Sequence, residues 1–233
     1  MTTPNFFVVG MPRAGTTTLW TLLRAHPQVF MPEIKEPRHF DDDLPPDPYA
    51  RFRRAPLPHS AVSVCRDRTA YLALFAQAEN QRAVGEASLY IRSGVAAQRI
   101  CDFNPQAKFI LMLRDPVDAL YSLYHLHLRN ASIRCTFDEF FSEFSPWYQR
   151  LPDRVRQIQE LFGHDRICIH LFEELSLDPA RVYRSLLQFL EVSPDFSPEF
   201  KKYNSSSEST RPGVAAGILS VLHSPAVTQL RRR

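Results

Sequence analysis

The sequence predicts an α/β protein, a three-layer sandwich in which a central parallel sheet is flanked by helices on both faces. Three observations predict this fold class. Short apolar runs alternate with segments of helical periodicity along most of the chain, the pattern of strand-helix units around a parallel sheet. Residues 108–113 are apolar without alternation, as expected of a strand covered on both faces. The first apolar run, residues 6–9, leads through a glycine-bounded turn directly into a helical pattern.

Length and charge favour one folded unit. The chain has 233 residues and 44% hydrophobic content, which is enough for one sizeable core, so we expect a single domain over residues 1–233. The net charge is +3 and the isoelectric point is near 8.7. This mildly basic balance indicates no nucleic-acid partner, and it fits an anionic small ligand or a solvated basic surface equally well. Nothing in the sequence indicates an oligomeric state.

The spacing of the cysteines and the length of the apolar segments bear on metal sites, disulfides and membrane spans. The four cysteines are widely separated, with no C-x-x-C pair and no Cys/His cluster at metal-ligand spacing. The sequence therefore indicates neither a zinc site nor a disulfide framework. It also shows no signal-peptide pattern at its start, and no apolar stretch approaches the roughly 18 residues of a membrane-spanning helix. We expect a cytoplasmic protein with no transmembrane segment.

Each element follows from a local pattern. Strands are expected at residues 6–9, 28–31, 83–86, 108–113 and 166–172. Helices are expected at residues 16–25, 69–79, 94–103, 116–128, 137–144, 153–162, 179–190 and 214–222. His26 ends the first helix, because a residue before proline is pushed out of the α region. Asp115 begins the helix at 116–128 as an acidic cap, with Pro116 in its first turn.

Two segments are predicted to be largely irregular. Residues 41–66 are rich in proline and charge and show little periodicity. We interpret them as a long excursion of the kind in which functional loops lie. Residues 193–233 combine a serine-rich loop with the last expected helix.

The turn between the first strand and the first helix has the glycine spacing of a phosphate-binding loop without its lysine. Gly10 and Gly15 keep the spacing of G-x-x-x-x-G-K-[ST], but Thr16 stands where the lysine belongs. A cation is present instead at Arg13, inside the loop. Free N–H groups at the helix start make an anion site. Three hydroxyls there can cap the helix or contact an anion: Thr16, Thr17 and Thr18. The loop therefore predicts an anionic nucleotide, and a plain structural turn is the alternative.

An arginine and a serine follow the most apolar strand. Arg114 comes directly after residues 108–113, and Ser122 lies eight residues later, two turns into the next helix. Carboxyl ends of strands in open α/β sheets face the binding crevice, so we expect Arg114 to point into it. Ser122 could share an anion with Arg114. Surface positions are the alternative for both side chains.

A charged segment at residues 33–41 follows the second strand. It contains two candidate general bases, Glu36 and His39. A solvated loop is the alternative interpretation of this string.

These segments, in this order, resemble the sulfotransferases that use 3′-phosphoadenosine 5′-phosphosulfate (PAPS), over most of residues 5–204. In that family a loop with a basic residue, a small residue, Gly and Thr binds the 5′-phosphosulfate. Residues 13–17 (Arg-Ala-Gly-Thr-Thr) match this loop, with arginine in place of the commoner lysine. The family binds the 3′-phosphate with an Arg followed eight positions on by a Ser, and Arg114 and Ser122 match that spacing.

Two further segments are similar to the same family. Residues 35–40 (Lys-Glu-Pro-Arg-His-Phe) look like Lys/Ala-Glu-Pro-His-Phe-Phe, which places the family's base on Glu36. Residues 85–90 are similar to Gly-Glu-Lys-Thr/Ser-Pro-x-Tyr. Ala87 and Leu89 depart from that pattern, at positions where the family would contact its acceptor.

The resemblance implies a P-loop-type sulfotransferase that uses PAPS and no metal, and that sulfates a hydroxyl or amine of a small-molecule or carbohydrate acceptor. It implies that Glu36 accepts the proton of the acceptor, with His39 as a reserve base, and that Arg13 stabilises the leaving group. The excursion at 41–66 is expected to help form the acceptor pocket. The residues expected to bind PAPS are Arg13, Ala14, Gly15, Thr16, Thr17, Thr18, Arg114, Ser122, Arg211 and Gly213.

Two other functions fit parts of the sequence. One is an ATP-dependent small-molecule kinase, in which Asp115 would bind magnesium, although the loop lacks the kinase's lysine. The other is a nucleotide-binding module without catalysis. Ala87 fits that alternative, as does the short C-terminal part, where residues 211–213 (Arg-Pro-Gly) are the only trace of the family's basic 3′-phosphate loop.

Overall fold

A five-stranded sheet organises the protein. The computed structural model describes residues 2–55 and 64–200. Its strands are β1 (Phe6–Gly10), β2 (Val29–Phe30), β3 (Ala83–Ser88), β4 (Lys108–Leu113) and β5 (Ile167–Leu171). They lie in the order β2-β3-β1-β4-β5, and neighbouring strands are parallel. After β1 the chain passes to β2 at one edge of the sheet, and after β4 it passes to β5 at the other edge. The carboxyl ends of β1 and β4 therefore flank the topological switch point, where ligands bind in such sheets.

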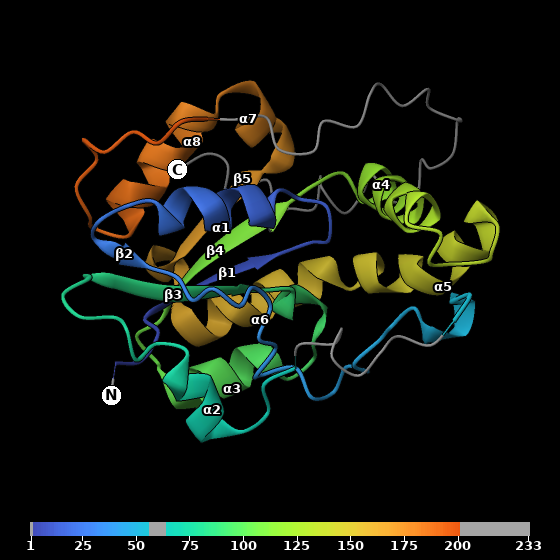
Figure 1. Cartoon of the computed structure of the whole chain (residues 1–233), viewed down its shortest axis with the longest axis horizontal. Coiled ribbons are helices and arrows are strands. Elements are labelled where there is room, and N and C mark those ends of the chain that lie inside the picture. Colours follow the sequence, from blue (N-terminus) through green and yellow to red (C-terminus); the bar gives the residue numbers. More distant parts are fainter. Residues whose placement is uncertain (1, 56–63, 201–233) are drawn as a thin grey trace.

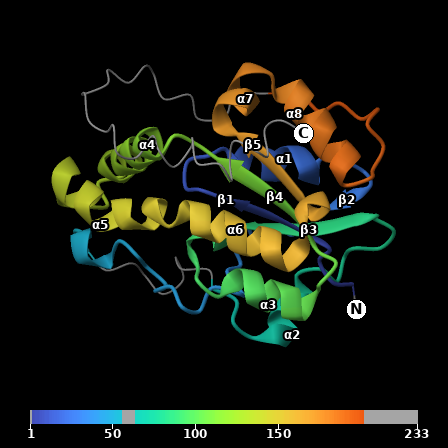
Figure 2. The ribbon, with the colours of Figure 1, turned by 180° about the vertical axis from the view of Figure 1, so that it is seen from behind.

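Helices cover both faces of the sheet. One face carries α1 (Thr16–Arg24), α7 (Phe172–Leu177) and α8 (Pro179–Phe189), as Figure 1 shows. The other carries α3 (Ala96–Phe103) and α6 (Leu151–Phe162), and Figure 2 shows α6 running across it. The remaining helices are α2 (Arg68–Ala73), α4 (Pro116–Arg129) and α5 (Phe137–Gln149), with short 3-10 turns η1 (Ala50–Phe52), η3 (Tyr90–Arg92) and η4 (His164–Arg166). The predicted three-layer α/β class is confirmed.

The two central strands are held by packing on both faces. Every residue of β1 is buried, and on β4 only Lys108 is partly exposed. The rings of Phe7 on β1 and Phe109 on β4 stack with their centroids 5.8 Å apart, and Phe40 packs edge-on to Phe7 at 5.9 Å. Burial on both faces explains the continuous apolar run in β4. It also fixes the ends of these strands, from which the site is built.

Several element boundaries differ from the sequence prediction. The helix expected at 69–79 ends at Ala73, where the chain passes into successive turns. The helix expected at 137–144 continues to Gln149, with Pro146 inside it. The sequence did not reveal α7, because its first residue continues the apolar run of β5. The Glu174 carboxylate accepts a hydrogen bond from the Leu171 N–H at 3.0 Å and so begins this helix.

The two irregular segments are described in part. Within 41–55 and 64–66, η1 is the sole helical turn and Arg53 forms one isolated bridge to Ile133. The helix expected at 214–222 lies outside the described residues. None of the helices within residues 2–55 and 64–200 is long and apolar enough to span a membrane.

Gly85 provides a test of the packing between β1 and β3. It pairs with Phe6, and a Cβ at this position would stand 2.5 Å from the fully buried Phe6 ring. We expect Gly85→Ala to lower the free energy of unfolding by about 1–3 kcal/mol, because the ring has no free space to enter. Urea denaturation measures the loss. In a Phe6→Leu background the same substitution should cost less, and an equal cost in both backgrounds would contradict this explanation.

Candidate active site

One cavity at the carboxyl ends of β1 and β4 brings together most of the residues predicted from sequence. It has a volume of about 310 Å³. Its walls include the β1–α1 loop, the segment after β2, the end of β4, and α4. The predicted residues that line it are Arg13, Gly15, Thr16, Thr17, Thr18, Glu36, Arg114 and Ser122. The cavity therefore joins the anion loop, the arginine-serine pair and a candidate base.

The β1–α1 loop is shaped by backbone conformations that few residues adopt. Arg13 and Gly15 have φ of 64° and 84°, both in the left-handed region. Gly15 is also the N-cap of α1 and supplies no side-chain cap, so the first N–H groups of the helix are left for an anion. At Gly10 a Cβ would stand 2.4 Å from Thr16 Cγ2. Ala14 is buried in the loop and does not line the cavity.

Arg13, Ser122 and Arg114 converge on this loop from three separate segments. Arg13 Nε donates a hydrogen bond to Ser122 Oγ at 3.0 Å. Arg114 Nη1 donates to the backbone oxygen of Arg13 at 3.0 Å, and its guanidinium lies 4.3 Å from the centroid of the Phe172 ring. The expectation that Arg114 points into the crevice at the strand end agrees with this geometry.

The two arginines are short of countercharge. Neither forms an ion pair with a carboxylate of the described residues, and Arg114 Nε is buried there without a partner. Burial lowers the pKa of Arg13, as do the positive charges of Arg114 and Arg129. Burial also lowers the pKa of Arg114, with Asp118 and other acids opposing. Because arginine stays charged, an oxyanion bound here would supply both the missing charge and a missing acceptor.

Glu36 reaches the cavity from the segment after β2. Its backbone N–H donates to the Ala87 oxygen at 2.9 Å, which ties it to the end of β3. Its carboxylate accepts a hydrogen bond from Lys35 Nζ at 2.6 Å. Lys35 also lines the cavity. We assigned it no role from sequence, although its place beside a candidate base was a signal. It brings a lysine to a site whose loop has Thr16 at the lysine position.

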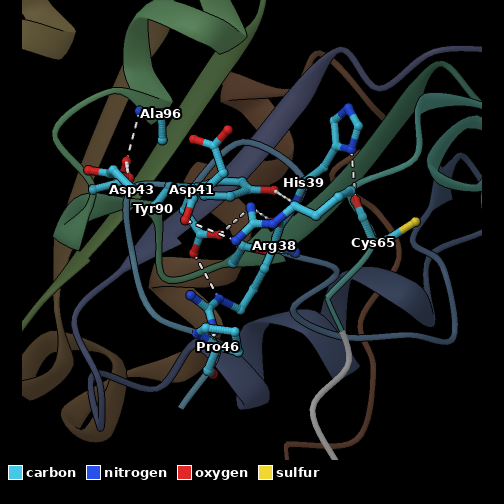
Figure 3. Close-up of polar contacts among 12 residues, drawn as sticks. Arg38, His39, Asp41, Asp43, Pro46, Cys65, Tyr90 and Ala96 are labelled. Carbon is cyan, nitrogen blue, oxygen red and sulfur yellow. Dashed lines mark hydrogen bonds and ion pairs between the residues drawn. The ribbon is translucent and has the colours of Figure 1, made fainter. Parts of the chain in front are cut away.

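His39 does not reach this cavity. Its ring stacks on Tyr71 with centroids 4.2 Å apart, and its Nδ1 lies 2.8 Å from the Cys65 backbone oxygen (Figure 3). It lines a second cavity, of about 470 Å³, beside Arg66. Burial lowers the pKa of His39, and the hydrogen bond with Cys65 partly opposes this. The structure therefore separates the two candidate bases, and of these Glu36 alone lies beside the anion loop.

Some predicted site residues are not described by the structure, and some cavity residues had no predicted role. Arg211 and Gly213 lie outside the described residues. Phe172 lines the cavity but was not predicted. Tyr49 and Leu89 also line it, and both come from segments expected on the acceptor side. Phe172 follows β5 as Arg114 follows β4, so the rule that strand ends face the crevice could have found it. Tyr49 comes from the excursion at 41–66, where no local pattern marks a single residue.

Asp115, the acid considered as a magnesium ligand, accepts hydrogen bonds from the backbone of the helix that follows it. Asp115 Oδ1 accepts hydrogen bonds from the backbone N–H groups of Val117 and Asp118, at 2.9 and 3.1 Å. This carboxylate is therefore engaged as the N-cap of α4. No group of three His, Cys, Asp or Glu side chains within residues 2–55 and 64–200 is arranged to hold a metal ion.

The fold and the cavity define a class, an α/β protein with a P-loop-type anion site at its switch point. The model of the sulfotransferase family matches residues 4–197. The chain belongs to the sulfotransferase family.

Three known proteins illustrate the similarity. A crystal structure of a sulfotransferase from Alicyclobacillus acidocaldarius has a TM-score of 0.78 and 31% identity, and the match covers 100% of this chain and 96% of that one. The membrane-associated sulfotransferase kil1 of Dictyostelium discoideum is 33% identical over 127 residues, 54% of this chain and 23% of that protein. The mouse bifunctional heparan sulfate N-deacetylase/N-sulfotransferase 4 is 24% identical over 217 residues, 83% of this chain. The match to the mouse protein also covers 23% of its length, so the chain spans less than a quarter of either of these two relatives.

His127 on α4 offers a pH test of the cavity's surroundings. Burial lowers its pKa to about 4, and the charge of Arg53 acts in the same direction. The ordinary value is 6.5, so the unfolded chain binds more protons between these two values. The free energy of unfolding should therefore fall as pH drops from 6.5 towards 4. Proton NMR of the imidazole measures the titration, and His127→Gln should remove this part of the pH dependence. Titration of His127 near pH 6.5 would contradict the burial argument.

Proposed function

We propose that this protein transfers a sulfuryl group from PAPS to a hydroxyl or amine of a carbohydrate or small-molecule acceptor. One observation carries the proposal: a single cavity holds the anion loop, the Arg114–Ser122 pair and Glu36. Membership of the sulfotransferase family supports the reaction type. The similarity to a heparan sulfate N-sulfotransferase supports a carbohydrate acceptor.

The cavity residues fit an adenosine donor with phosphate groups at both ends. Gly15, Thr16 and Thr17 would hold the 5′-phosphosulfate end with backbone N–H and hydroxyl groups. Arg114 and Ser122 would hold the 3′-phosphate. The buried Nε of Arg114, which has no acceptor among the described residues, is the observation that supports this fit. When bound, PAPS supplies the activated sulfuryl group.

The chain's own residues would then act through position and charge. Glu36 would accept the proton of the attacking hydroxyl or amine at its carboxylate, and Lys35 restrains that carboxylate through its hydrogen bond. Arg13 keeps its charge and is a poor acid, so it would stabilise negative charge on the leaving side. Preorganised donors of this kind lower the barrier without covalent participation by the enzyme.

Two structural details favour this function over the alternatives. Asp115 caps α4 through its Oδ1, which accounts for this acid without a magnesium ion. Glu36 lies in the same cavity as the anion loop, which favours catalysis over nucleotide binding alone.

Titration calorimetry with 3′,5′-diphosphoadenosine tests the donor site. The unmodified protein should bind it without magnesium. Arg114→Ala should weaken binding by about 1.5–3 kcal/mol, because it removes a charge-assisted hydrogen bond to phosphate. Arg24→Ala is the matched control, since Arg24 pairs with the exposed Glu33 outside the cavity. Unchanged affinity in Arg114→Ala would remove Arg114 from the site, and binding of ATP only with magnesium would overturn the proposed function.

Turnover of labelled PAPS with a panel of acceptors tests the base. Glu36→Gln should abolish transfer while leaving diphosphoadenosine affinity within a few fold, because an amide cannot accept the proton. Glu33→Gln, on the exposed part of the same segment, should leave transfer unchanged. Loss of nucleotide binding in Glu36→Gln would instead place Glu36 in the donor site.

A further inference from the structure

A buried carboxylate on β3 lies next to the segment that carries Glu36. Glu86 is fully buried and accepts three hydrogen bonds from hydroxyl groups. Tyr71 and Tyr90 donate to its Oε1 at 2.9 and 2.7 Å, and Ser88 donates to its Oε2 at 2.7 Å. No lysine or arginine of the described residues pairs with it. Its effect is therefore to fix the direction of three hydroxyl groups.

Two of those hydroxyls hold the backbone that follows Glu36. Tyr90 Oη accepts a hydrogen bond from the His39 N–H at 3.0 Å, which Figure 3 shows. Ser88 Oγ accepts from the Arg38 N–H at 3.3 Å. A hydroxyl has one proton, and both of these protons are directed at Glu86. Their lone pairs are consequently free to accept from residues 38 and 39.

The segment needs such support because its backbone is strained. Glu36 and Arg38 have φ of 61° and 56°, in a region that costs non-glycine residues of order 1 kcal/mol or more. The N–H groups of residues 36, 38 and 39 all bond to residues 87–90, and Pro37 has no N–H to give. Every backbone donor from Glu36 to His39 is thus tied to the end of β3 or to η3, which follows it.

We infer that Tyr90, oriented by Glu86, is a positioning residue for the candidate base Glu36. Its hydroxyl accepts a hydrogen bond from the His39 N–H, in the second peptide bond after Pro37. This contact fixes the backbone of the segment and thereby the position of the Glu36 carboxylate in the cavity. Ser88 performs the same task one residue earlier. The expected effect on turnover rests on the proposed function, whereas the hydrogen bonds to the backbone of residues 38 and 39 do not.

Tyr71 supplies a closely matched control. Both tyrosines are buried, and both donate to the same oxygen of Glu86. Only the Tyr90 hydroxyl also accepts from the segment after Glu36. The Tyr71 ring stacks on His39, and a phenylalanine would keep that contact. Tyr71→Phe and Tyr90→Phe therefore remove two hydroxyls that donate to the same oxygen, of which that of Tyr90 also bonds to this segment.

Kinetics distinguishes the two variants. Tyr90→Phe should lower kcat by about 10- to 100-fold, since small displacements of a catalytic group have effects of this size, with diphosphoadenosine affinity unchanged. Tyr71→Phe should stay within about three-fold of the unmodified protein. Equal losses of kcat in the two single variants would overturn the inference.

Amide hydrogen exchange gives a readout that needs no acceptor. The N–H of His39 should exchange faster in Tyr90→Phe than in Tyr71→Phe, and equal exchange in both would overturn the inference. If His39 exchange differs but the unmodified protein sulfates none of the acceptors tested, the proposed function fails and the positioning contact stands. Should Tyr90→Phe fail to fold, Ser88→Ala tests the same clamp through exchange at Arg38.

Discussion

The parallel pairing of β1 with β4 fixes the position of the site and of the segments that build it. Gly10 lies opposite Met112 in the register, and the Met11 N–H continues the ladder to the Met112 oxygen at 2.9 Å. This pairing sets the anion loop beside the residue that leaves β4, which is Arg114. Because helices bury both faces of these strands, neither strand end can shift without opening the core. A rigid sheet edge of this kind can hold charged side chains at fixed separations.

The site uses that rigidity to keep like charges together. The Arg114 guanidinium donates a hydrogen bond to the Arg13 backbone oxygen. Burial removes part of the water around both guanidinium groups, and neither has a carboxylate partner among the described residues. Such an arrangement is unfavourable in the free protein and becomes favourable when an oxyanion enters. The one carboxylate on the cavity wall that was predicted as a base, Glu36, is restrained by Lys35. The two arginines and Glu36 thus reach one cavity from different segments of the chain.

The donor side and the base side are built on different neighbours of β1. The proposed donor side depends on β4 and the helix after it, through Arg114 and Ser122. The proposed base side depends on β3 and the turn after it, through the hydrogen bonds of Ser88 and Tyr90 to residues 38 and 39. A left-handed backbone at Glu36 and Arg38 accompanies the separation of the Glu36 and His39 side chains into different cavities. Two candidate bases three residues apart are therefore not interchangeable, and the backbone conformation is the physical reason.

Local patterns of glycine, apolar residues and charge were enough to predict the strand-loop-helix unit, the buried strand before Arg114, and Glu36 and His39 as two candidate bases. The resemblance to the sulfotransferases then favoured Glu36. The sequence did not determine helix ends such as Ala73, or α7, where tertiary contacts and a side-chain cap decide the boundary. The placement of Lys35 and Tyr49 on the cavity wall, and of His39 away from it, follows from contacts between distant parts of the chain. Spacing along a chain fixes which residues are near in sequence. The direction of each side chain depends on backbone angles and on partners far away in the chain.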